Sequence, residues 1–214
     1  MSTASDRVRA LVREGKLEAD EAGELLSAVG TKDVPSSGAL AMLLNPFDRL
    51  GGGRAACIGV VVALACFAAT RLGIRFDGFL DIHTGLVSTK IAAIEQAVDW
   101  IVPSLTFFAV ARVLGSRARL LDTLGMCGLA RVPYALSAPL LGLLVPHAAK
   151  DPAIRPIDIP ILVIVLCALA VQIYWLVRGY QNASGFTKTK LTVSFLFGFI
   201  LAEILSKVCI STLS

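Results

Sequence analysis

Five charged side chains lie within long apolar stretches of this sequence, and they are the residues best placed to do chemistry. They are Glu95, Asp99, Arg131, Glu203 and Lys207. A charge is costly to bury in a membrane, and intramembrane charges commonly form ion pathways, proton relays or ion pairs. Three interpretations stay open: ion pairs that fix helix packing, a proton or ion pathway, and side chains that extend to the interface, which fits Glu95 best.

The stretches that carry these charges belong to a set of five, and each is long enough to cross a membrane. They cover about residues 55–72, 94–114, 123–146, 159–177 and 191–210. The mean hydropathy of +0.75 and the 56% hydrophobic content agree with this pattern. We therefore predict an all-α integral membrane protein with five transmembrane helices. Pro133, Pro139 and Pro146 predict that the third helix is kinked or broken.

Charge in the connections predicts the orientation of these helices. Lys and Arg are more frequent in the first, third and fifth segments outside the apolar stretches than in the others. By the positive-inside rule, the N-terminus then lies in the cytoplasm and the C-terminus outside. The longest external connection, residues 73–93, is expected to be an amphipathic stretch at the outer interface. Small residues at Ala55, Gly59 and Ala63 favour a close helix contact, within the chain or in a dimer.

Depth along the helices predicts which charges meet. With a rise of about 1.5 Å per residue, Asp99 and Lys207 both lie about 6–8 Å from the outer side. Glu203 lies about 12 Å from the outside, and Arg131 about 12 Å from the inside, of a core about 30 Å thick. We predict the intramembrane charge pairs Asp99–Lys207 and Arg131–Glu203.

Motifs for catalysis are absent from the sequence. There is no Gly-x-Ser-x-Gly turn, and the two histidines, His83 and His147, are not part of a His-Glu-x-x-His motif. The five cysteines lie in apolar stretches without Cys-x-x-Cys spacing. No dense basic stripe suits a nucleic acid. We therefore predict a non-enzymatic protein without catalytic, cofactor-binding or metal sites, whose first partner is the lipid bilayer.

The first 53 residues are more polar than the rest, and we predict two parts in them. Residues 1–30 form a cytoplasmic helical hairpin, and residues 31–53 form a linker and an interfacial segment; the five-span domain covers 54–214. Residues 13–26, Arg-Glu-Gly-Lys-Leu-Glu-Ala-Asp-Glu-Ala-Gly-Glu-Leu-Leu, resemble the SHOCT-like short hairpin modules of bacterial membrane proteins. That resemblance implies oligomerisation or docking. The alternative is a charged helix pair without a partner.

The second helix of this hairpin has one apolar face, which is a candidate docking face. It consists of Ala22, Leu25, Leu26 and Val29. Two short helices bury little surface by themselves. We therefore expect this face to contact another protein, a second copy of the chain or the membrane.

The order of several elements resembles the Yip family of five-span membrane proteins, and most of all its bacterial branch. The elements are a cytoplasmic head, Asn45-Pro46, the basic loop at 115–119, Leu124-Gly125, the run Ala130-Arg131-Val132-Pro133, and a polar turn before the last span. The positions that match the family pattern are Asn45, Pro46, Gly125 and Pro133. The resemblance implies a scaffold or adaptor in the bacterial inner membrane that contacts another membrane or cytoplasmic protein, or a second copy. The family's Asp-Leu-x-Gly-Pro element is missing here.

A small transporter or channel subunit is the alternative function, and it rests on the charges within the spans. The two interpretations predict different interiors. A transporter needs a continuous polar cavity lined by Asp99, Arg131 and Glu203, whereas a scaffold has these groups paired in a solid core.

Overall fold

The computed structural model describes the backbone of residues 45–143 and 156–213, together with single positions near the N-terminus. Those positions are 8, 11, 12, 17, 18, 21 and 22. The chain divides into two compact units, Met1–Leu44 and Asn45–Ser214. Each unit is described by itself.

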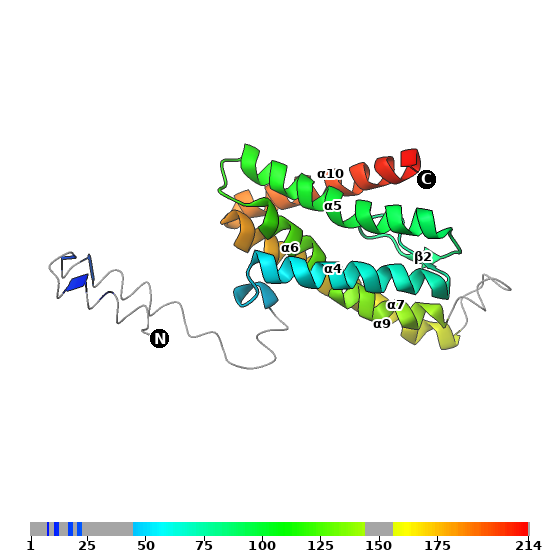
Figure 1. Cartoon of the computed structure of the whole chain (residues 1–214). Helices are drawn as coiled ribbons and strands as arrows, with labels where there is room; N and C mark the ends of the chain where they lie inside the picture. Colours follow the sequence, from blue (N-terminus) through cyan, green and yellow to red (C-terminus); the bar gives the residue numbers. More distant parts are fainter. Residues whose placement is uncertain are drawn as a thin grey trace. The chain divides into compact units, whose positions relative to one another are not determined.

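Five helices of the second unit are long and apolar enough to cross a membrane (Figure 1). They are formed by α4 (Gly52–Ala69) continued by η2 (Thr70–Leu72), α5 (Thr89–Val113), α6 (Leu120–Ala130) with α7 (Val132–Gly142), α9 (Ile159–Ser184) and α10 (Lys188–Leu213). The shorter elements are η1 (Pro46–Asp48), η3 (Pro156–Asp158), and strands β1 (Ile74–Arg75) and β2 (His83–Thr84). The predicted number and placement of long apolar helices is confirmed.

Residues 120–142 form two helices rather than one. Arg131 ends α6 and begins α7, and its N–H bonds to the Gly128 carbonyl at 3.3 Å, three residues back. Pro133 follows in the first turn of α7, where its missing N–H group leaves no carbonyl unpaired. A single residue, Arg131, thus separates α6 from α7. Pro146 lies outside the described residues.

Helix α6 packs against three neighbours, α4, α5 and α9, and therefore lies at the centre of the bundle. Its contact with α4 is the closest: a Cβ atom built on Gly128 would lie only 2.5 Å from the Gly59 Cα atom. The indole of Trp100 packs beside this crossing and donates to the Leu124 carbonyl at 2.9 Å. Ala55 and Gly59 thus make their close contact within the chain.

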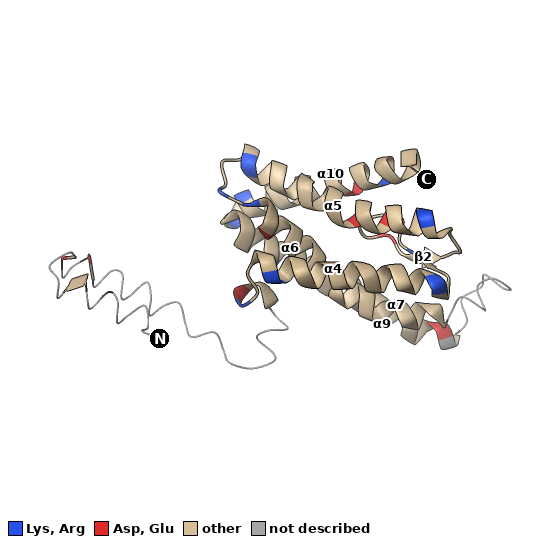
Figure 2. Cartoon of the chain, in the orientation of Figure 1, with Lys and Arg blue, Asp and Glu red and all other residues tan. Residues whose placement is uncertain are grey.

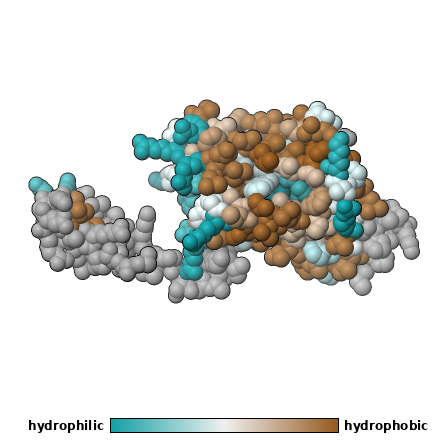
Figure 3. Space-filling view, in the orientation of Figure 1, coloured by the Kyte–Doolittle hydropathy of each residue, from teal (hydrophilic) through white to brown (hydrophobic). Residues whose placement is uncertain are grey.

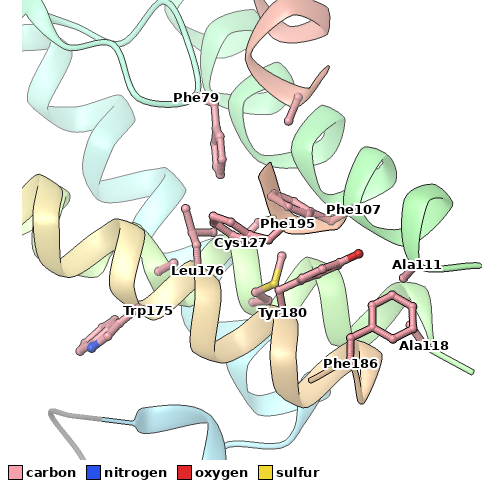
Figure 4. Packing of buried hydrophobic residues seen from close by; sticks show 13 residues of the cluster. Phe79, Phe107, Ala111, Ala118, Cys127, Trp175, Leu176, Tyr180, Phe186 and Phe195 are labelled. Carbon is pink, nitrogen blue, oxygen red and sulfur yellow. The ribbon is translucent and has the colours of Figure 1, made fainter. Parts of the chain in front are cut away.

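An aromatic cluster fills the middle of the bundle (Figure 4). Phe107 of α5 stacks on Phe195 of α10 with 5.6 Å between ring centroids, and it lies 5.2 Å from the Tyr180 ring of α9. Phe79 joins the cluster from the connection between α4 and α5, 6.5 Å from Phe107. Three long helices and one connecting segment therefore share a single core.

That connection, residues 73–88, differs from its prediction. Ile74, Phe76 and Phe79 are almost completely buried, so the segment enters the bundle instead of lying on an interface. Strands β1 and β2 form a hairpin in which Ile74 pairs with Thr84 and Arg75 with His83. The prediction was wrong because the chain's own helices leave a space that these apolar side chains fill. We call residues 73–88 the inserted hairpin.

Main-chain groups of the inserted hairpin are hydrogen-bonded by the helices around it. The Tyr134 hydroxyl donates to the Leu80 carbonyl at 2.6 Å, and Gln172 Nε2 lies 3.5 Å from the Phe79 carbonyl. Non-helical backbone at membrane depth requires such partners, since lipid supplies none.

Polar and apolar surfaces separate along the bundle. Many Lys and Arg residues lie near its two ends in Figure 2, and Figure 3 shows a broad apolar surface between more hydrophilic ends. Large apolar side chains stay exposed along α9 and α10, including Leu166 and Phe197. A solvent-exposed apolar surface of this extent is typical of a protein that contacts lipid.

The first unit, Met1–Leu44, is described at few positions. Ala22 is helical and buried, and its N–H group donates to the Glu18 carbonyl at 2.9 Å. Leu25, Leu26 and Val29, the other members of the predicted docking face, lie outside the described residues.

Candidate functional site

One face of α5 carries three polar side chains that are shielded from solvent. Glu95 and Asp99 are completely buried, and Gln96 is 4% exposed. Residues four apart lie on the same face of a helix, so Glu95 and Asp99 point in similar directions. This face is turned toward the inserted hairpin and the junction between α6 and α7, which supply the basic partners.

Arg131, at the junction of α6 and α7, is the basic partner in the interior. Its Nη2 atom donates to Gln96 Oε1 at 2.8 Å and lies 3.9 Å from Asp99 Oδ2. Arg131 as a whole is 2% exposed. The expected pair Arg131–Glu203 is therefore wrong: within the described residues the carboxylate within 4 Å of Arg131 is that of Asp99.

Lys207 of α10 forms a second group, nearer the hairpin end of the bundle. Its Nζ atom lies 2.9 Å from Asp81 Oδ2 and 3.6 Å from Glu203 Oε1. The expected pair Asp99–Lys207 is therefore wrong as well. Depth carries no information about which side of each helix a residue occupies, and it placed Asp99 and Arg131, which lie 3.9 Å apart, at different levels. The rotation of α10 turns Lys207 and Glu203 toward the inserted hairpin.

Glu95 has a partner from the inserted hairpin. Arg75 donates to Glu95 Oε1 at 2.8 Å, and the Glu95 carboxylate is completely buried. We expected the Glu95 side chain to extend to the membrane interface. The structure instead shows it buried and paired. Arg75 and Asp81 were not among the predicted site residues because they lie outside the apolar stretches. The signal that could have found them is their interleaving with Phe76 and Phe79.

The hairpin backbone passes very close to α10. A Cβ atom on Gly78 would lie 3.1 Å from Glu203 Oε1 and 3.2 Å from Lys207 Cε. Glycine at this position lets the hairpin approach near enough for the Lys207–Asp81 ion pair to form. The charges on α10 therefore hold the hairpin in place.

Three possible metal ligands meet on the hairpin. One ligand atom from each of Asp77, Asp81 and His83 lies within 4.8 Å of the other two, and His83 Nδ1 is 3.2 Å from Asp77 Oδ1. Imidazole and carboxylate groups are ligands that Zn²⁺ accepts. We predicted no metal site, because His83 is not part of a metal-binding motif in the sequence. The pairing of the two hairpin strands is what places His83 close to Asp77. The ammonium of Lys207 beside Asp81 opposes a further cation here.

Several buried polar atoms of the interior group have no hydrogen-bond partner among the described residues. They are Asp99 Oδ1 and Oδ2, Arg131 Nη1 and Gln96 Nε2. Unpaired buried polar atoms cost about 1–3 kcal/mol each, more when charged. Three of the cavities in the described part of the chain are lined by none of Asp99, Arg131 and Glu203. The geometry therefore supports helix packing more directly than passage of an ion.

The positions of the family pattern lie in two places. Asn45 and Pro46 are buried at the start of η1, and Gly125 packs on the start of α4, where a Cβ atom would lie 2.6 Å from the Gly52 carbonyl oxygen. These three belong to the same end of the bundle, whereas Pro133 lies beside Arg131 in α7. The Asn45 amide donates to Asp48 Oδ1 at 2.7 Å and forms no cap with a main-chain group.

A cavity of about 230 Å³ lies next to η1. Its lining includes Phe47, Leu50, Gly52, Arg119, Asp122 and Asn182. Arg119 donates two bonds of 3.0 Å to Asp122, and Asn182 Nδ2 donates to Asp48 Oδ1 at 3.3 Å. We call this site the η1 cavity. It is the most polar surface depression among those identified and a candidate contact site for a protein partner.

Comparisons with models of protein families, with curated proteins and with solved structures find no match for this chain. Its function is therefore argued from its own geometry.

Proposed function

We propose that this chain is a non-enzymatic, five-span scaffold or adaptor of the Yip-like type, inserted in the bacterial inner membrane with its N-terminus in the cytoplasm. The single observation that carries the proposal is the pairing of the charged side chains of the long helices. Arg131 and Lys207 each have a carboxylate within 4 Å, and Glu95 bonds to Arg75. Buried charges that pair with one another serve to fix the packing and register of helices.

The Yip-like assignment is supported by the order of the elements and by where its pattern positions lie. Asn45, Pro46 and Gly125 gather at the end that holds the η1 cavity. On the proposed topology, this end and the head (residues 1–44) face the same side of the membrane. The η1 cavity and the head are then the two surfaces through which a cytoplasmic partner is recruited.

Removal of the head tests the adaptor role. Deleting residues 1–37 is expected to leave the five helices inserted, since the compact bundle unit begins at Asn45. It should remove most of the partners recovered by crosslinking in native membranes. Leu25→Asp with Leu26→Asp should do the same in the full-length chain. Recovery of the same partners in the same amounts by the truncated protein would contradict docking through the head.

Crosslinking from defined positions tests the η1 cavity. A photoreactive residue at Leu50, in the cavity lining, should capture a protein partner. The same residue at Leu136, which is 74% exposed on the side of α7, is the matched control and should capture mainly lipid. Equal protein capture from both positions would remove the argument for this cavity.

A small transporter or channel subunit remains the second candidate, and one observation favours it. Asp99 and Arg131 keep buried polar atoms without partners, as groups that bind a transported ion or proton would. Flux into proteoliposomes that depends on Asp99 and disappears in Asp99→Asn would support transport. If the flux does not exceed that of empty liposomes, transport is contradicted and the scaffold role is left.

A further inference from the structure

Helices α4 and α5 diverge and leave a groove between them. It has a volume of about 390 Å³, within the range of small-molecule sites. Its walls are apolar and include Val60, Leu64, Phe67, Ala97 and Ile101. We call it the α4–α5 groove.

Gln96 is the one amide side chain in the lining of this groove. Its contact with Arg131 fixes its orientation. The guanidinium of Arg131 has only donors, so the Gln96 atom 2.8 Å from Nη2 is the amide oxygen. The NH₂ group is then the end of the amide that Arg131 does not contact. Gln96 Nε2 is buried and has no acceptor among the described residues, although the side chain is only 4% exposed. A buried donor without an acceptor costs free energy, and an acceptor in the groove would reach Nε2 once the Gln96 side chain turns toward the groove on binding.

Two cations stand at the mouth of the groove. Arg71 lies one turn beyond Phe67, and Lys90 lies seven residues before Ala97 on the same face of α5. Arg71 Nη2 donates to Thr89 Oγ1 at 2.7 Å, which brings its guanidinium next to Lys90 in the chain. Both side chains are exposed, and within the described residues neither has a carboxylate within 4 Å.

These features follow one another in the order of a phospholipid's chemical groups. The cations come first, the amide donor lies about 9 Å deeper along α5, and the apolar groove continues inward. Side chains of a helix lean toward its N-terminus, so the Gln96 amide reaches back toward the mouth. A phosphate, an ester carbonyl and an acyl chain have the same order and the matching chemistry.

We propose that the α4–α5 groove binds one anionic phospholipid, with its phosphate on Arg71 and Lys90, an ester carbonyl on Gln96 and an acyl chain along α4 and α5. The proposal rests on the membrane location proposed above. A partner helix fits less well, because the carbonyl groups of a transmembrane helix are already hydrogen-bonded and would leave Gln96 Nε2 unpaired. A second copy of this chain would also bring Arg71 and Lys90 toward further cations.

The test measures lipid retained by the full-length protein. The wild-type chain is reconstituted in vesicles of mixed phosphatidylcholine and phosphatidylglycerol, extracted in mild detergent and weighed by native mass spectrometry. We expect one phosphatidylglycerol per chain, in preference to phosphatidylcholine. Arg71→Gln with Lys90→Gln should lower this preference roughly tenfold or more, because each surface cation contributes to attraction of an anionic headgroup.

Filling the groove tests its role directly. Ala97→Phe should displace the acyl chain and abolish retention. The matched controls are Ala170→Phe, on an exposed position of α9, and Arg117→Gln with Lys188→Gln, two exposed cations outside the groove. All three control positions are exposed, as Ala97 is, and these variants should retain lipid as the wild type does.

Three outcomes would overturn the proposal. They are equal retention of lipid by wild type and Ala97→Phe, equal affinity for the two headgroups, and efficient crosslinking of Ala97→Cys to a second copy in native membranes. A wash of the membranes with alkaline carbonate distinguishes these outcomes from a chain that is not inserted in the membrane. A wild-type chain released by carbonate refutes both proposals, whereas a chain that stays in the membrane but holds no anionic lipid refutes the lipid site alone.

Discussion

The guanidinium of Arg131 lies 3.9 Å from the carboxylate of Asp99, and both side chains are almost completely buried. Arg131 lies between α6 and α7, while Asp99 lies within α5, one turn beyond Glu95. The charge pair thus joins the broken helix to an unbroken one. Removal of this charge pair should shift the junction between α6 and α7 as well as change the electrostatic energy of the interior.

Arg131→Ala should destabilise the bundle by about 3–5 kcal/mol, because Asp99 would be left buried without its cation. Arg131→Met combined with Asp99→Asn should recover part of this loss, since no buried charge then remains. Alkylation of Cys127, which is completely buried, reports unfolding when it is followed by mass spectrometry during heating in detergent. Arg117→Ala, at an exposed loop position, is the control and should change little. Additive single and double effects would show that the two residues do not interact.

Phe79→Ala should cost about 3–5 kcal/mol, a value typical of a core phenylalanine. The side chain is 1% exposed and contacts both Phe107 and Phe199. Leu86→Ala, in the same connection at a position that is 85% exposed, should change stability by less than about 0.5 kcal/mol. The same alkylation assay measures both. A neutral Phe79→Ala would mean that the inserted hairpin does not enter the core.

Gly128→Ala should destabilise the α4–α6 contact by about 1–3 kcal/mol, because the added methyl group meets the Gly59 backbone. Gly53→Ala is the matched change in α4. There the nearest atom to a new Cβ is 3.7 Å away, at the end of the Leu121 side chain, so this change should be neutral or slightly stabilising. Thermal unfolding curves of the two variants in one detergent compare them. If both glycines tolerated alanine equally, the two helices would have to lie farther apart.

Reporter fusions test the proposed topology. A reporter after Ser214 should be active outside the cytoplasm, and one within residues 117–122 should be active inside, because the basic connections stay on the cytoplasmic side. A cytoplasmic C-terminus would contradict the five-span arrangement. The Arg117→Gln, Lys188→Gln variant offers a control, since removal of cytoplasmic cations should weaken the orientation preference and leave the number of spans unchanged.

The sequence predicted some parts of this structure well, because their cause is local. Length and apolar content predict each of the five long helices. Small residues at Ala55 and Gly59 indicate where α4 is approached closely.

The pairing of charges could not be predicted in the same way. Depth places Asp99 and Lys207 at one level, but the rotation of each helix is set by packing over the whole bundle. The inserted hairpin was missed for a related reason: Phe76 and Phe79 suit an interface as well as a core, and only the space left between distant helices distinguishes them. Gln96 carries no charge, so nothing in its type or spacing marked it.

The Lys207–Asp81 ion pair joins residues 126 positions apart, which has a consequence for biogenesis. With synthesis at about 5–20 residues per second, the ribosome needs on the order of ten seconds to make the chain between them. Throughout that interval Phe79 lacks its contact with Phe199, and Asp81 lacks its counter-ion. The hairpin is therefore synthesised long before its final neighbours exist, and the arrival of α10 is the event that completes the interior.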